Sequence, residues 1–156
     1  EAGASPESVI LSGVGKTRDE IRHALDAGVL FLSVESKPEL ELISEVAIQT
    51  RHSARVVFRI NPDVDPRTHP YISTGLERNK FGISLSDASS VIQAGISLPG
   101  VSIVGVGCHI GSQITELGPF EEAIAGIVDL ARDLQRQGIA LEYLDVGGGL
   151  GISYNT

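Results

Sequence analysis

Short apolar, β-rich runs alternate with amphipathic helical segments along the whole chain, and this alternation limits the possible folds. Strands are predicted at residues 9–11, 29–34, 55–60, 101–109 and 141–146, and helices at 17–27, 36–47, 86–94 and 119–137. Repeated strand–helix–strand units make right-handed crossovers and a parallel sheet. Two α/β architectures fit this order: an open doubly wound sheet, or part of a (β/α)8 TIM barrel, which needs about 250 residues when whole.

The helices carry their own end signals. Thr17 with Glu20 predicts a capping box and Gly28 a stop, and Ser36 with Glu39 predicts a second capping box. The segment 119–137 is the clearest helix, because its apolar residues recur on one face: Phe120, Ala123, Ile127, Leu130, Ala131 and Leu134.

The composition excludes several classes of protein. A net charge of −8 without a basic cluster argues against nucleic acid or anionic lipid as the main partner. No apolar run approaches the roughly 20 residues of a membrane span. The single cysteine, Cys108, rules out an internal disulfide and fits a reducing, cytoplasmic location. The 156 residues are enough for about one domain, and the absence of methionine leads us to expect a piece of a longer protein.

Unusual residues follow each predicted strand. The segments are Ser12–Lys16, Glu35–Ser36, Asn61, His109–Ser112 and Gly147–Gly149. The carboxyl ends of parallel strands meet at one edge, where α/β proteins place their functional groups. We therefore expect these segments on one rim. The loop from Asn61 to about Ile83 is much longer than usual, which suggests a functional or interface role.

The sequence "DVGGGLG", residues 145–151, predicts a phosphate site. Three glycines after a strand let the backbone approach a ligand and direct N–H groups at an anion. The alternative is a flexible turn between strand and helix. The spacing does not fit a dinucleotide-binding fingerprint, because Ile152 and Tyr154 stand where its last glycine would be.

The sequence "SGVGKT", residues 12–17, resembles the end of a nucleotide-binding P-loop but lacks its first glycine. Ile10 stands five residues before Gly15, so the loop is too short to wrap a triphosphate. We predict that Lys16 is an exposed charge on the rim and that Thr17 caps a helix.

His109 is a candidate for holding a flat ring. Strict alternation would put it on one strand face with Val101, Ile103, Gly105 and Gly107, and the two glycines would leave space beside the imidazole. The alternative is a core histidine with satisfied hydrogen bonds. No metal site is predicted, because the other histidines lack ligand spacing. Asp63 and Asp65 lie among prolines, which favours a turn over a metal site.

Taken together, these motifs resemble the diaminopimelate decarboxylase family, pyridoxal-phosphate-dependent enzymes of the alanine-racemase-like fold. The matching stretches cover nearly the whole chain, in the family's order: "SGVGKTRDEI", "VES", "RINPDVDPRTHPYISTG", "KFGIS", "GCHIGSQI" and "LDVGGGLGISY". The resemblance implies that residues 1–156 are the central part of a pyridoxal-phosphate-binding barrel, spanning about its third to seventh strands.

The resemblance also implies roles for individual residues. His109 would stack on the pyridine ring of pyridoxal 5'-phosphate. The phosphate would be held by Ser112, Gly147, Gly148 and Gly149, while Arg59 would lie near the cofactor and Lys80 near a homodimer interface. The Schiff-base lysine strand, the eighth strand and the C-terminal β-domain of the family have no counterpart here, so this chain alone is expected to be inactive.

The activity implied for the full-length protein is decarboxylation of meso-2,6-diaminopimelate to L-lysine and carbon dioxide in lysine biosynthesis, in the cytoplasm or, in a plant, the plastid stroma. Two other readings remain open. One is a decarboxylase or racemase of the same fold acting on another amino acid. The other is a non-catalytic module that binds phosphate or pyridoxal phosphate.

Overall fold

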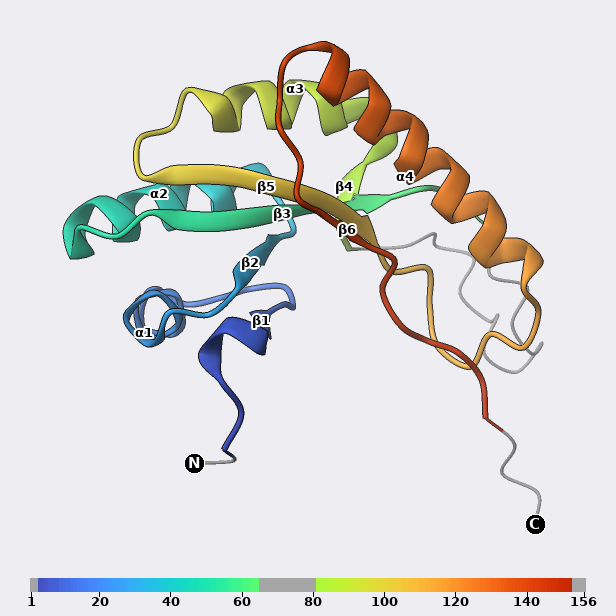
Figure 1. Ribbon diagram of the computed structural model, residues 1–156, viewed down its shortest axis with the longest axis horizontal. Helices are drawn as coiled ribbons and strands as arrows, with labels where there is room; N and C mark the ends of the chain where they lie inside the picture. Colours follow the sequence, from blue (N-terminus) through green and yellow to red (C-terminus); the bar gives the residue numbers. More distant parts are fainter. Residues whose placement is uncertain (1–2, 65–80, 153–156) are drawn as a thin grey trace.

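The structure is a computed structural model that describes residues 3–64 and 81–152. Within these residues a short 3-10 helix, Pro6–Ser8, precedes strands and α-helices that alternate along the chain (Figure 1). The strands are β1 (Ile10–Leu11), β2 (Phe31–Val34), β3 (Ala54–Asn61), β4 (Ile83–Ser84), β5 (Val101–Cys108) and β6 (Tyr143–Asp145). The helices are α1 (Arg18–Ala27), α2 (Lys37–Thr50), α3 (Leu85–Ile96) and α4 (Gly118–Arg136).

The sheet is parallel, and its order distinguishes the two predicted architectures. The strands lie in chain order, β1-β2-β3-β5-β6, while β4 pairs only with the last two residues of β3, Ile60 and Asn61. A doubly wound sheet would reverse its order at a switch point and carry helices on both faces. Here the strands follow one another without reversal, as in a barrel, so the prediction of a partial (β/α)8 barrel is confirmed.

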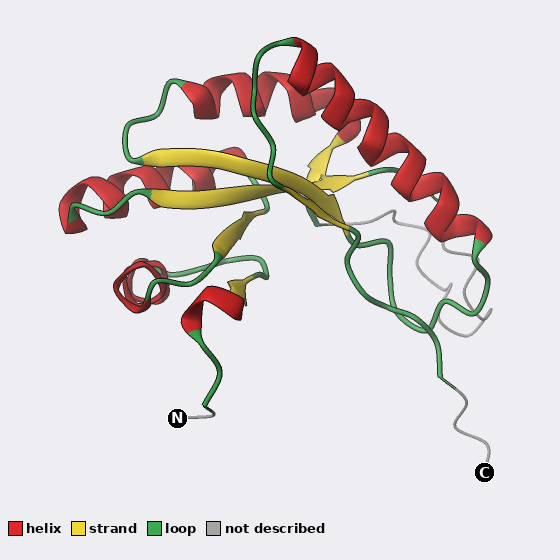
Figure 2. Ribbon diagram, in the orientation of Figure 1, coloured by secondary structure: helices red, strands yellow, loops and turns green. Residues whose placement is uncertain are grey.

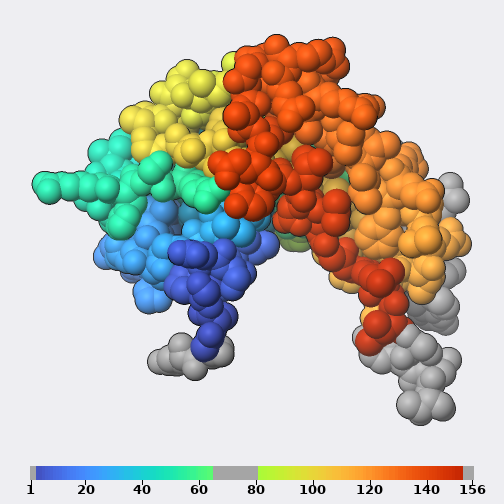
Figure 3. Space-filling view, in the orientation of Figure 1, coloured from blue at the N-terminus to red at the C-terminus, as the bar shows by residue number. Residues whose placement is uncertain are grey.

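The main core lies on the helix side of the curved sheet. Residues from all four helices share one cluster with alternate strand residues such as Leu32, Val56, Phe58 and Val106. Figures 1 and 2 show α3 and α4 lying along the outer side of the sheet. On the opposite, inner face, the described residues form a small apolar cluster of Phe31, Val57 and Val104, with Leu30 and Tyr143 packed against it. Below it the molecule is hollowed between its N-terminal and C-terminal segments (Figure 3), which leaves room for a site.

Most of the predicted helix signals are confirmed. Thr17 and Glu20 form the capping box of α1, and Gly28 ends this helix in a left-handed conformation with φ 72°. The predicted apolar face of α4 packs into the main core. The second capping box is only half formed. The Ser36 hydroxyl accepts from the Glu39 N–H at 3.4 Å, but the Glu39 carboxylate turns away to Lys16.

Two strands begin two residues later than predicted, and one strand was missed. β2 begins at Phe31, because the Val29 N–H donates to the Ala24 carbonyl and so completes the end of α1. β6 is shorter than predicted, covering Tyr143–Asp145. β4 was missed, since two residues carry no periodic pattern and the strand exists only through its pairing with β3.

A bulge in β5 breaks the predicted alternation of its faces. Val56 pairs with Ile103 but the next β3 residue, Val57, pairs with Gly105, so Val104 is the extra residue. Val101 and Ile103 consequently pack on the same helix side as Val106 and Cys108. The prediction that Val101 and Ile103 share a face with His109 is therefore wrong.

No helix within the described ranges combines the length and the apolar character needed to cross a membrane.

Candidate functional site

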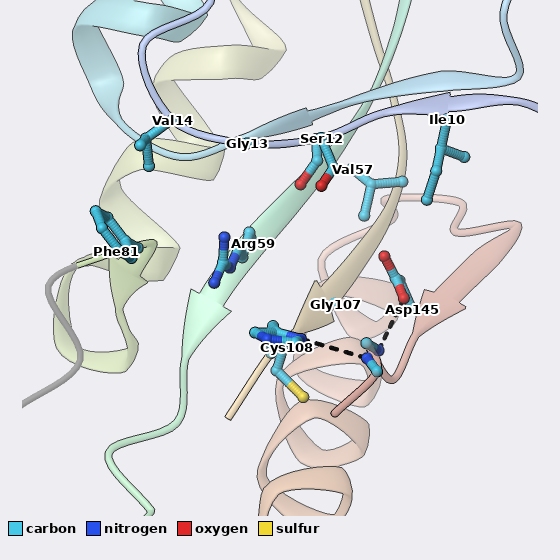
Figure 4. Close-up of a pocket in the computed structure, with 14 residues that line it drawn as sticks. Ile10, Ser12, Gly13, Val14, Val57, Arg59, Phe81, Gly107, Cys108 and Asp145 are labelled. Atoms are coloured by element: carbon cyan, nitrogen blue, oxygen red, sulfur yellow. Dashed lines mark hydrogen bonds between the residues drawn. The ribbon is translucent and has the colours of Figure 1, made fainter. Parts of the chain in front are cut away.

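A pocket of about 570 Å³ opens at the carboxyl ends of the strands (Figure 4). Its lining comes from segments far apart in the sequence, which the parallel sheet brings to one rim as predicted. They are the loop after β1 (Ser12, Gly13, Val14), β2 (Ser33), β3 (Val57, Arg59), the end of β5 (Gly107, Cys108, His109) and the end of β6 (Asp145, Gly147, Gly148), with Ile10 and Phe81 at the sides.

Arg59 brings a fixed positive charge to this pocket. Its Nη1 donates to both carboxylate oxygens of Glu35, at 2.9 and 3.0 Å. The Glu35 side chain is 2% exposed, so the guanidinium neutralises a buried carboxylate at the end of β2. The sequence analysis placed Glu35 on the rim but gave it no role. A charged residue directly after an apolar strand could have indicated an ion pair in the site.

His109 is held against the glycine turn by a backbone contact. The Gly148 N–H donates to its Nδ1 at 3.3 Å. Burial, followed by the positive charge of Arg59, lowers the pKa of His109, and Asp145 and Glu35 only partly oppose this. Because Nδ1 is an acceptor, the neutral imidazole carries its proton on Nε2. His109 therefore offers the pocket a flat, uncharged ring.

The lowered pKa predicts a pH dependence. An unfolded histidine has a pKa of about 6.5, so at pH values between the two pKa values the unfolded chain binds more protons. The contribution of His109 to stability is then complete above about pH 6.5 and is lost as the pH falls through the folded pKa. NMR titration of the cofactor-free protein, with the His109 signal assigned by its absence in His109→Phe, should give a pKa below 6.5. A value at or above 6.5 would contradict this electrostatic picture.

The glycine turn after β6, residues 147–149, has space for a side chain at one position and none at the other two. A Cβ on Gly148 would meet nothing within 4 Å. A Cβ on Gly149, where φ is 98°, would lie 1.8 Å from the Gly111 carbonyl oxygen, and one on Gly147 would lie 2.4 Å from that of Cys108. Gly148 therefore presents bare backbone to the pocket. Gly147 and Gly149 let the turn after β6 approach the chain after β5 closely.

The amides of this turn already have partners. The Gly147 N–H donates to Asp145 Oδ1 at 2.8 Å, and the Gly148 N–H makes the long contact to His109. An anion at this turn would compete with the weaker of these two bonds, the one to the imidazole. The predicted phosphate role of the turn thus requires a small rearrangement at Gly148.

The predicted site residues divide into two groups. Arg59, His109, Gly147 and Gly148 line the pocket, whereas Ser112 and Gly149 do not. Ser112 is exposed in the loop after β5. That loop pairs with the chain after the glycine turn, because the Ile114 N–H donates to the Gly149 carbonyl at 2.9 Å. Ser112 therefore lies beside the turn rather than in the pocket wall.

The role predicted for Gly105 and Gly107 is wrong. Their missing side chains do not create the space beside His109, because β6 occupies their bare sides: a Cβ on Gly105 would lie 2.4 Å from the Tyr143 carbonyl oxygen and one on Gly107 would lie 2.6 Å from that of Asp145. Both glycines instead let β6 approach β5 closely. This approach brings Asp145 and the glycine turn to the pocket.

The prediction for Lys16 is also wrong. Its side chain is 3% exposed, and its Nζ donates to Glu39 Oε1 and to the Ser33 carbonyl, both at 2.6 Å. A partner 23 residues along the chain cannot be recognised from local sequence. Thr17 caps α1 as expected.

The metal alternative finds no support in the described ranges, where no cluster of three histidine, cysteine or acidic side chains could hold a cation. Asp63 lies in a turn, as predicted: its N–H donates to Asn61 Oδ1 at 2.9 Å and its φ is 55°. Asp65 and Lys80 lie outside the described residues. Cys108 is buried, which raises its thiol pKa.

Comparison with known proteins places this geometry in context. Residues 1–156 match the pyridoxal binding domain of the pyridoxal-dependent decarboxylases. The diaminopimelate decarboxylase of Aquifex aeolicus is 44% identical over 99% of this chain, and that of Pseudomonas aeruginosa is 49% identical over 98%. The chain spans 37% of the length of each of these relatives.

Solved structures of decarboxylases have a fold similar to that of this chain. The crystal structure of diaminopimelate decarboxylase from Helicobacter pylori complexed with L-lysine superimposes with a TM-score of 0.92 and 43% identity, covering 99% of this chain and 39% of that one. A lysine decarboxylase from Selenomonas ruminantium shares the fold, with a TM-score of 0.79 at 23% identity over 96% of this chain and 36% of that one.

Proposed function

The chain belongs to the pyridoxal-dependent decarboxylases, and from this we propose that the full-length protein uses pyridoxal 5'-phosphate to decarboxylate meso-2,6-diaminopimelate to L-lysine and carbon dioxide. We place residues 1–156 in the central part of its barrel, at about the third to seventh strands. The single observation that carries the proposal is the pocket in which His109, Arg59 and the glycine turn converge.

The residues of this pocket fit the proposed cofactor. The bare backbone at Gly148 leaves room for a phosphate, and the guanidinium of Arg59, paired with Glu35, lies in the pocket wall. The flat imidazole of His109 offers a surface on which an aromatic ring can stack. When bound, pyridoxal phosphate supplies an electron-accepting ring for the electron pair that carbon dioxide leaves behind.

The chain's own residues then have positioning roles. His109 holds the ring flat and, as a neutral imidazole, adds no competing charge. Gly147 and Gly148 orient the phosphate end, with Gly149 and Ser112 shaping the neighbouring loop. Glu35 fixes the guanidinium of Arg59 at the pocket wall. Each role concerns binding and orientation, and the lysine that bonds the cofactor is supplied from outside this chain.

The choice of substrate rests on the relatives. Two of the relatives described above are diaminopimelate decarboxylases at 44% and 49% identity, and a solved diaminopimelate decarboxylase is complexed with L-lysine, the product of the proposed reaction. We also propose that the full-length protein is a homodimer, which the family resemblance supports. We propose that it is cytoplasmic, which the free, buried thiol of Cys108 supports.

The proposal predicts a substrate preference that one assay can measure. The full-length protein with pyridoxal phosphate should release carbon dioxide from meso-diaminopimelate, at a rate well above that with lysine, ornithine or arginine. A chelator should not change the rate, since the proposed reaction uses the ring of pyridoxal phosphate and no metal ion. A faster reaction with another amino acid would show that diaminopimelate is not the preferred substrate. If none of these amino acids releases carbon dioxide, the proposed enzymatic function is wrong.

A further inference from the structure

Among the described residues, the ion pair between Lys16 and Glu39 is the most buried pair of charges that the proposed function leaves unused. The exposed fractions of the two side chains are 3% and 7%. The ammonium has three N–H donors and meets three acceptors: Glu39 Oε1, the Ser33 carbonyl and the Gly13 carbonyl. With every proton engaged, Lys16 is a fixed structural charge and not a nucleophile.

The three acceptors belong to three separate parts of the rim. Gly13 lies in the loop after β1, Ser33 in β2, and Glu39 in the first turn of α2. β1 pairs with β2 only as far as Leu11, opposite Leu32. The ammonium of Lys16 donates to the very next β2 carbonyl, so it continues the connection between the two segments beyond the end of the strand.

Two of these acceptors also form the pocket wall. Gly13 and Ser33 line the pocket, on the side opposite the glycine turn, and Ser12 and Val14 lie beside them. Figure 4 shows the segment from Ser12 to Val14 crossing the pocket above Arg59. The wall is intrinsically adaptable, because Gly13 and Gly15 both have positive φ, 106° and 73°. Lys16 therefore restrains a segment that its two glycines make flexible.

Stability alone gives a weak reason for this pair. Two buried charges lose their hydration, and apolar side chains of similar size are often as stable in such positions. Lys16 also lies immediately before the N-terminus of α1, where the helix dipole disfavours a positive charge. Burial raises the pKa of Glu39; Lys16 opposes this effect, the charge of Glu35 reinforces it, and the backbone of Glu35 opposes it. The pair is thus held at some energetic cost beside the site.

We propose that Lys16, anchored by Glu39, is a positioning residue that sets the Ser12–Val14 wall of the pocket through the Gly13 and Ser33 carbonyls. This inference rests on the proposed function only for the identity of the ligand, pyridoxal phosphate. The restraint on the wall itself is a property of the cofactor-free protein.

The test removes both charges together, because a single substitution would leave a lone buried charge and lower stability for that reason. In the full-length protein, Lys16→Met with Glu39→Met should keep the melting temperature within about 5 °C of the native value. Amide hydrogen exchange at residues 12–15 of the cofactor-free protein should become faster. The dissociation constant of pyridoxal phosphate should rise about tenfold or more, because a displaced wall misplaces the ligand.

The matched control is Lys37→Met with Glu41→Met, an exposed pair on α2 that gives the same changes of residue type and charge. It should leave exchange and cofactor affinity unchanged. Native exchange and native affinity in the Lys16–Glu39 variant would overturn the proposal, as would its failure to fold, which would make the pair a requirement of the fold. Failure of the native protein to bind pyridoxal phosphate would instead count against the proposed function, and the exchange measurement would still decide this inference.

Discussion

Replacing Gly148 with valine in the full-length protein should raise the dissociation constant of pyridoxal phosphate by about 10²- to 10⁴-fold. The valine side chain would enter the pocket, since nothing lies within 4 Å of a Cβ at this position. The phosphate would lose about two charge-assisted hydrogen bonds of roughly 1.5–3 kcal/mol each, and every 1.4 kcal/mol or so is a factor of about ten. Fluorescence titration with the cofactor measures the change.

The melting temperature separates this effect from damage to the fold. Gly148→Val should leave it nearly unchanged, because the backbone there is not left-handed and the space is open. Gly149→Ala is the matched comparison: its Cβ would overlap the Gly111 carbonyl, so it should lower stability by about 2–4 kcal/mol. Unchanged cofactor affinity in Gly148→Val, or a loss of stability equal to that of Gly149→Ala, would contradict the assignment of the turn.

Local sequence was sufficient for features whose causes are local. The capping box of Thr17 and Glu20 and the apolar face of α4 depend on residues three or four apart, and both are confirmed. The gathering of His109, Arg59 and the glycine turn in one pocket was also predictable. It follows from a general property of parallel sheets, whose carboxyl ends share an edge.

Features that depend on distant partners were not predictable. Lys16 is buried only because Glu39 and the Ser33 carbonyl accept from it. Gly105 and Gly107 are needed by β6, which lies more than 30 residues further along the chain. The bulge at Val104 is visible only in the pairing with β3. In each case the sequence shows the residue type but not the neighbour that explains it.

The positions of the lysines decide which of them can bond the cofactor. No lysine is among the described residues that line the pocket. Lys16 is buried with three acceptors on its ammonium, and Lys37 is exposed at the start of α2. Lys80 lies outside the described residues. From the positions of Lys16 and Lys37 and from the family resemblance, we expect a lysine outside residues 1–156 to face the aldehyde of pyridoxal phosphate.

The most direct measurement of this claim is chemical trapping in the full-length protein. The protein is mixed with pyridoxal phosphate and reduced with borohydride, and the labelled residue is identified by mass spectrometry. We expect stoichiometric labelling of one lysine outside residues 1–156. The chain of residues 1–156 alone should show only weak, scattered labelling and release no carbon dioxide from diaminopimelate. Stoichiometric labelling of Lys16, Lys37 or Lys80 in either protein would contradict the account.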